Sequence, residues 1–292
     1  MAEKIKNIGL FYQKQYFKGI VYDAVGNYKQ GAKNTIAARN KLLLFEKSIE
    51  KSDFLTASLE NQFELKTQYP GIITGIGMKH ETSIEGELKL GMYFDYTSGM
   101  PCIPASSVKG ALRSAFPQFD NHKKTTDKIK KAKAFILHQI LSELKVTCFE
   151  SLAKPEEMTD KHYKKIKDIE EEIFDGINKD TTKKDKNGKM KSHLSIYEKD
   201  IFHDAFIVKG DSKGRILADD AITRHPNPLK NPKPVLFLKI PSGVSIQFNF
   251  DLKNGAILTA KEKHDLFEQI ILYYGLGAKT NVGYGQFDKI QQ

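Results

Sequence analysis

The sequence contains only two cysteines, Cys102 and Cys148, among 292 residues. Two are too few for a disulfide framework or a cysteine zinc site, so each is expected to be a small buried apolar residue. No apolar run approaches the roughly 20 residues that a membrane-spanning helix needs. The N-terminus, MAEKIKNIGLFYQKQ, also lacks the apolar core and the cleavage site of a secretory signal. We therefore expect a cytoplasmic protein without a membrane partner.

Arginine is scarce although the chain is basic. The net charge is +10 and the isoelectric point is near 9.2, yet of 46 basic residues only Arg39, Arg113, Arg215 and Arg224 are arginines. A strongly basic chain without an amphipathic membrane helix favours a nucleic-acid partner over a lipid surface. Lysine suits phosphate contact, whereas arginine is the usual reader of guanine edges. This composition predicts sequence-independent contact with a nucleic-acid backbone.

The most informative stretch is GLGAKTNVGYG, from Gly275 to Gly285, which follows a helical pattern and precedes a short strand-like tail. Its glycines can take positive φ or admit another chain where a Cβ would collide. The spacing does not match a nucleotide-triphosphate loop, because Ala278 and not glycine precedes Lys279. A helix C-cap followed by a tight turn is the alternative interpretation. The residues predicted to contact RNA here are Gly275, Gly277, Lys279, Thr280, Asn281, Gly283, Tyr284 and Gly285.

A second candidate segment is ASSVKGALRSAF, which predicts a helix capped by Ser106 or Ser107 and ended by Pro117. Lys109 and Arg113 are four residues apart and project from the same face near the helix N-terminus. A serine-rich helix start with two cations predicts a phosphate-binding site. A capped amphipathic helix with solvated cations is the alternative. Tyr284 of the glycine-rich stretch has two interpretations: its ring stacks on an RNA base, or it lies in the protein core.

The order of the expected elements indicates the fold class. The segment FELKTQYPGIITGIG predicts a strand that ends in a bend, VLFLKIPSGVSIQFNFDL predicts a hairpin, and TAKEKHDLFEQIILYYGLG predicts a helix capped by Thr259. The sequence of strand, helix, hairpin, helix, glycine loop and strand is that of a split β-α-β unit. We therefore predict an α+β fold with a ferredoxin-like antiparallel sheet, similar to RNA-recognition sheets.

Residues 120–199 differ in composition from their surroundings. They are rich in lysine, contain no arginine, and begin with a stripe of apolar residues at helical spacing. We interpret them as a helical, lysine-rich insertion that packs loosely, with Lys183 to Lys191 mobile. The whole chain, 1–292, is then a single domain that carries this insertion.

Histidines and acids suggest two further sites. His80 follows the first predicted strand and could donate to phosphate or act as a general base, or it could be structural. A metal site could be formed by Asp219, Asp220 and His225. However, adjacent residues of an extended chain face opposite ways, and no third ligand has suitable spacing. We therefore predict neither a metal nor another cofactor.

Three segments together resemble a known family. IPASSVKGALR resembles the element I-P-G-S-S-[LV]-K-G-x-[LI]-R of the RAMP superfamily of CRISPR-associated proteins, and GLGAKTNVGYGQF resembles its C-terminal glycine-rich element. DDAITRHPNPLKNPKPVLFLKIPSG narrows the resemblance to the sixth-subunit family of the Cmr complex, the type III-B RNA-targeting effector. Ala105 departs from the glycine that is common in this element. Residues 120–199 lie outside the resemblance.

The resemblance implies a non-catalytic subunit that acts in antiviral defence. Such a subunit would hold the 3′ part of the guide RNA, or its duplex with target RNA, beside other Cmr subunits. A metal-independent endoribonuclease that processes guide precursors is the alternative, and it would need His80 or His225 to deprotonate a 2′-hydroxyl. A third possibility is an assembly protein whose basic surface meets acidic subunits.

Overall fold

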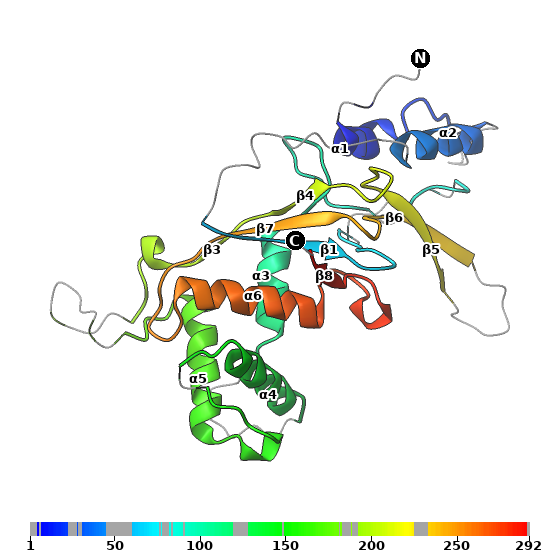
Figure 1. Ribbon diagram of the computed structural model, residues 1–292. Helices are drawn as coiled ribbons and strands as arrows, with labels where there is room; N and C mark the ends of the chain where they lie inside the picture. Colours follow the sequence, from blue (N-terminus) through cyan, green and yellow to red (C-terminus); the bar gives the residue numbers. More distant parts are fainter. Residues whose placement is uncertain are drawn as a thin grey trace.

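The computed structural model shows a mixed helix and strand architecture around one antiparallel sheet (Figure 1). It describes residues 5, 7–22, 28, 31–44, 60–75, 77, 82, 84–89, 91–118, 128–147, 149–180, 182, 188, 192–224 and 233–290. Cys102 is buried, as predicted, while Cys148 lies outside the described residues. The predicted mobility of 183–191 concerns residues that lie almost entirely outside them as well.

The main sheet is antiparallel and has the order β2-β4-β7-β1-β8, with β3 also paired to β7. Its strands are β1 (Asn61–Thr67), β2 (Cys102–Ile103), β3 (Ile201–Phe202), β4 (Ala205–Lys209), β7 (Ser245–Asp251) and β8 (Phe287–Lys289). β7 is central, because it pairs with β1 along one edge and with β4 and β3 along the other. The predicted α+β class is therefore confirmed.

Two helices cover one face of this sheet, α3 (Ala105–Ser114) and α6 (Ala260–Tyr274) (Figure 1). α6 begins at the predicted Thr259 cap, and the structure adds a capping box, in which the Thr259 and Glu262 side chains each accept a hydrogen bond from the other's backbone amide. Its inward side chains meet aromatic rings of the sheet, and the ring centroids of Phe250 and Phe267 lie 5.3 Å apart. Edge and tilted ring contacts of this kind add to the stabilisation from apolar burial.

The predicted hairpin is wrong in its pairing. The two segments form β6 (Lys233–Lys239) and β7, but β6 pairs with β5 (Ala218–Arg224) in a separate two-stranded sheet. Both edges of β7 are already taken by β1, β4 and β3, so no edge remains for β6. Pairing across the PSG turn is excluded by this central position.

The aromatic N-terminal segment is helical. A single turn, α1 (Ile8–Leu10), continues into a π-helical stretch, Phe11–Gln15, and α2 (Ala32–Leu44) follows. Tyr12 and Tyr16 are buried, and the Tyr12 hydroxyl donates to the carbonyl of Leu88 at 2.9 Å. α1 and α2 lie on the side of the sheet opposite α6 (Figure 1). The rings thus anchor these helices on the body of the protein.

The segment predicted to be an insertion, residues 120–199, contains two helices, α4 (Lys128–Glu143) and α5 (Asp160–Glu170), below α6 in Figure 1. The predicted apolar stripe of α4 points inward, because Leu137, Ile140 and Leu141 are buried in the same hydrophobic core as the sheet. The prediction that this segment packs loosely is therefore wrong for α4 and α5. Among the described residues, no helix combines the length and the apolar character that crossing a membrane requires.

Candidate nucleic-acid interface

The glycine-rich segment connects the end of α6 to β8 through a short 3₁₀ turn, Thr280–Val282. Gly275, Gly277, Gly283 and Gly285 have φ values of 71°, 100°, 95° and 71°, and Lys279 is also left-handed at 62°. Positive φ at these positions explains the glycines without reference to a ligand. The prediction that this stretch needs an unusual backbone is confirmed.

The chain that comes close to these glycines is the protein's own. The Gly285 amide donates to the Gly71 carbonyl at 2.8 Å, and the Leu276 amide donates to the Gly285 carbonyl at 2.8 Å. A Cβ at Gly275 would lie 2.5 Å from the Gly285 carbonyl, and one at Gly277 would lie 2.7 Å from that of Ile73. The interpretation that these glycines admit an RNA strand is therefore wrong for Gly275 and Gly285, which are buried against protein.

The tip of the loop is open to solvent. Gly277, Lys279 and Asn281 are exposed, and Thr280 is half-buried. Within the described part of the chain, the backbone amides of Gly277, Lys279 and Thr280 donate no hydrogen bond. Exposed amides next to a lysine can bind an anionic oxygen, as successive N–H groups do in phosphate-binding turns. The tip therefore keeps the phosphate-binding potential that the whole loop was predicted to have.

Tyr284 occupies the core position. It forms a small buried cluster with Ile73 and Phe237, and its hydroxyl donates to Asp220 Oδ2 at 2.8 Å. Burial and the bond to the Asp220 carboxylate raise the pKa of Tyr284 to about 12. The ring is 9% exposed, so it cannot stack on a base. Of the two interpretations of Tyr284, the structural one holds.

α3 starts after Pro104 without a serine cap. Asp204, in the connection between β3 and β4, accepts a hydrogen bond from the Ala105 amide at 2.6 Å. A carboxylate from a distant segment therefore satisfies the first free amide of the helix, and the predicted serine cap is wrong. Ser106 and Ser107 remain exposed, and their hydroxyls are available at the helix start.

Lys109 and Arg113 share a face of α3 as predicted, but this face turns toward the insertion and β3. The Arg113 guanidinium forms a bidentate pair with the Asp175 carboxylate at 2.8 and 2.9 Å, and its Nε lies 3.7 Å from Glu170. The Lys109 ammonium lies 5.4 Å from the centre of the Phe202 ring. Arg113 is thus neutralised within the protein, so the structure does not support it as a phosphate ligand.

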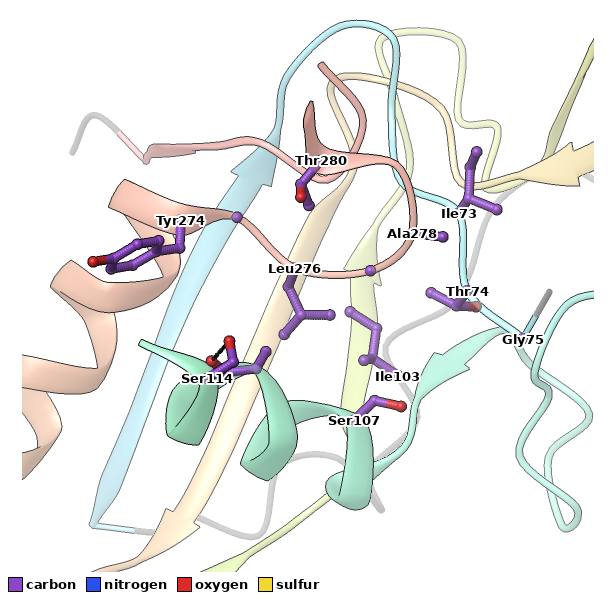
Figure 2. A pocket seen from close by; sticks show the side chains of 13 residues that line it. Ile73, Thr74, Gly75, Ile103, Ser107, Ser114, Tyr274, Leu276, Ala278 and Thr280 are labelled. Carbon is purple, nitrogen blue, oxygen red and sulfur yellow. Dashed lines mark hydrogen bonds between the residues drawn. The ribbon is translucent and has the colours of Figure 1, made fainter. Parts of the chain in front are cut away.

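The opposite face of α3 and the glycine loop enclose a pocket of about 480 Å³ (Figure 2). The third wall is the segment Ile73–Gly75, which the sequence analysis did not identify, although glycines flank it as they do the loop. The lining residues are Ile73, Thr74, Gly75, Ile103, Ser107, Ala111, Ser114, Tyr274, Gly275, Leu276, Gly277, Ala278 and Thr280. None of them is charged, and the buried Thr74 hydroxyl has no hydrogen-bond partner among the described residues. The pocket therefore offers neutral polar groups between apolar walls.

Further residues were singled out in the sequence as possible catalytic or metal-binding groups. His80 and His225 lie outside the described residues. Asp220 accepts from Lys239 Nζ at 2.5 Å as well as from Tyr284, and these bonds hold the pKa of its carboxyl below the ordinary value although burial opposes them. In the described ranges, no three His, Cys, Asp or Glu side chains are grouped so that they could hold a metal ion.

Comparison with known proteins identifies the family of this chain. No curated protein matches the sequence. The fold is similar to a chain of the cryo-EM structure of the type III-B Cmr-beta bound to cognate target RNA, with a TM-score of 0.50 and 21% identity over 98% of this chain and 86% of that one. The crystal structure of Cmr6 from Pyrococcus furiosus matches with a TM-score of 0.40 and 19% identity, over 79% of this chain and 97% of that one. The family model of the RAMP superfamily matches residues 64–288, and the chain therefore belongs to the RAMP superfamily.

Proposed function

We propose that this chain is a non-catalytic, RNA-binding scaffold subunit of a type III-B CRISPR effector complex of the Cmr kind. Family membership and the fold shared with a chain of the RNA-bound Cmr-beta support this assignment. The net charge of +10 gives the chain the electrostatic character of a nucleic-acid binder. Its partners would be guide RNA, target RNA and the other subunits, and it would act in the cytoplasm in antiviral defence.

The sheet topology supports a ferredoxin-like core. The order β1, α3, β4, β7, α6, β8 along the chain is that of a β-α-β-β-α-β unit, and the strands lie in the order β4-β7-β1-β8. Each helix thus crosses over a strand that lies between the two strands it connects. This arrangement brings the end of α6 and the glycine loop beside α3.

The observation that carries the proposal is the meeting of two motifs around one pocket. Ser107 of α3 and Gly277 and Thr280 of the loop line the same hollow, although they lie far apart in the sequence (Figure 2). At its rim, the exposed Lys279 and the free amides of the loop tip offer positive ends to phosphate oxygens. We propose that a sugar-phosphate strand runs along this rim and contacts it without base readout. Holding the 3′ part of the guide is the role that the resemblance suggests for such a strand.

The test is the salt dependence of RNA binding. Fluorescence anisotropy with a labelled single-stranded RNA of guide length, at several salt concentrations, gives the slope of log affinity against log salt. We expect Lys279→Ala to weaken binding and to reduce this slope by roughly 0.7 to 1, the contribution of one phosphate contact. The control is Lys261→Ala, which removes an exposed lysine at the far end of α6.

Three outcomes would each refute a different part of the proposal. Equal slopes for the Lys279 and Lys261 variants would remove the loop tip from the interface. A discrete cleavage product from CRISPR repeat RNA in the presence of chelator, lost in His80→Ala or His225→Ala, would make the chain an endoribonuclease. Stable association with partner subunits but no measurable affinity for RNA would favour a pure assembly role.

A further inference from the structure

A tight turn next to the glycine loop presents an exposed aromatic ring. The turn Gln68–Gly71 follows β1 and is closed by the bond from the Gly71 amide to the Gln68 carbonyl at 2.7 Å. It is fixed to the glycine loop on both sides, since Gln68 donates to the Gln286 carbonyl at 2.9 Å and the Gly71 carbonyl accepts from Gly285 at 2.8 Å. The position of Tyr69 relative to the loop is therefore set by main-chain bonds.

The Tyr69 side chain is 84% exposed, although a ring of this size normally buries most of its surface. Val282, at the tip of the neighbouring loop, is 63% exposed, and a Cβ at Gly283 would lie 3.7 Å from Pro70. The phenol of Tyr69 is close enough to Tyr284 to contribute to its raised pKa, after burial and Asp220. We refer to the exposed Tyr69 ring, with Pro70 of the same turn and Val282 of the loop joined to it, as the apolar platform, and the exposed Lys279 lies three residues before Val282.

The positive charge of Lys279 next to the platform favours RNA over a protein as the molecule that binds there. A protein partner of ordinary composition would need only the apolar surface. A nucleic-acid strand needs an aromatic face next to cationic or N–H groups that bind its phosphate oxygens. Lys279 and the free amides of the loop tip supply those groups in the same loop as Val282. An exposed ring, unlike the buried Tyr284, can stack on a base of any identity, and this tolerance suits a protein that does not read sequence.

We propose that Tyr69 is a stacking platform for one unpaired nucleobase of the RNA strand held at the loop tip. This inference rests on the proposed RNA-binding function and adds to it a specific base contact. The phosphate of the same strand lies at Lys279, and the base turns toward the Tyr69 ring. The site takes single-stranded RNA, because bases in a duplex have no free face to offer.

The chain contains no tryptophan, which gives the proposal a direct optical test. Tyr69→Trp introduces a single indole whose fluorescence should be quenched when an RNA base stacks on it. The control is Tyr197→Trp, because Tyr197 is 87% exposed and lies beside β3, at the end of β7 away from the loop. We expect quenching on addition of a guide-length single-stranded RNA for the first variant and no change for the second.

Affinity provides the second measurement. Base stacking contributes about 1–3 kcal/mol by alanine substitution, so Tyr69→Ala should weaken RNA binding roughly 5- to 150-fold. The salt slope should stay unchanged because no charge is lost, and Tyr69→Phe should retain most of the affinity. Circular dichroism and thermal melting should match the unaltered chain, since the side chain is exposed.

The outcomes separate this inference from the function on which it rests. Binding that is lost in Lys279→Ala but unchanged in Tyr69→Ala, with no quenching of the Tyr69→Trp indole, overturns the stacking platform and leaves the RNA-binding function intact. No binding of RNA by the unaltered protein, alone or with its partner subunits, overturns both.

Discussion

The glycines of the loop can be tested for what they accommodate. If Gly285 is required by the protein's own packing, Gly285→Ala should reduce the free energy of unfolding whether or not RNA is present. The left-handed φ of 71° costs an alanine about 1–2 kcal/mol. The new Cβ would also collide with the Leu276 carbonyl. Relieving that collision breaks two main-chain bonds, to Gly71 and Leu276, each contributing about 0.5–1.5 kcal/mol. The expected loss is therefore about 2–5 kcal/mol.

Gly283→Ala is the matched control. Its φ of 95° carries a similar backbone cost, but the nearest atom to its Cβ would be Pro70 Cδ at 3.7 Å, an ordinary contact. We expect a loss of about 1–2 kcal/mol for this variant. Urea unfolding followed by far-UV circular dichroism measures both values. Equal stabilities for the two variants would refute the packing argument, as would a Gly285→Ala protein that is normally stable but impaired in RNA binding.

Two further predictions concern buried ionisable side chains. Arg113→Ala should lower the free energy of unfolding by about 1–3 kcal/mol in chemical denaturation, because it leaves the buried Glu170 without its cation. Its RNA salt slope should equal that of the unaltered protein, and a reduced slope would return Arg113 to the RNA interface. His138 is fully buried with neither ring nitrogen hydrogen-bonded to described residues, and burial, followed by His162 and Lys165, lowers its pKa. The unfolded chain then binds a proton more readily, so stability is full above about pH 6.5 and decreases as the pH falls below it. The loss of stability between pH 7.5 and 5.5 should be smaller in His138→Leu, and an unchanged loss would contradict the assignment.

The position of the insertion limits which surfaces remain for partners. α4 and α5 contribute to the same core as the sheet, and Arg113 joins α3 to Asp175 just after α5. The face of α3 that carries Lys109 and Arg113 is therefore half-buried against protein. Only the face with Ser107 and Ala111 opens toward the glycine loop. The lysine-rich composition of the insertion did not indicate this covering role, because composition reports charge and not packing.

Local features were determined by the sequence alone. The Thr259 cap of α6, the α3 helix and the positive φ of the loop glycines each depend on a few neighbouring residues. Such features follow from side-chain chemistry and backbone sterics within one or two turns. The α+β class also followed, because it requires only the order of the elements.

The tertiary structure decided which segments meet. It paired β6 with β5 and not with β7, turned Arg113 toward Asp175, and placed Gly71 against Gly285. It also buried Tyr284 and exposed Tyr69, two tyrosines that both stand beside a glycine or a proline in a turn. These outcomes depend on contacts between residues far apart in the chain, and no local pattern encodes which of several chemically suitable partners will be adjacent.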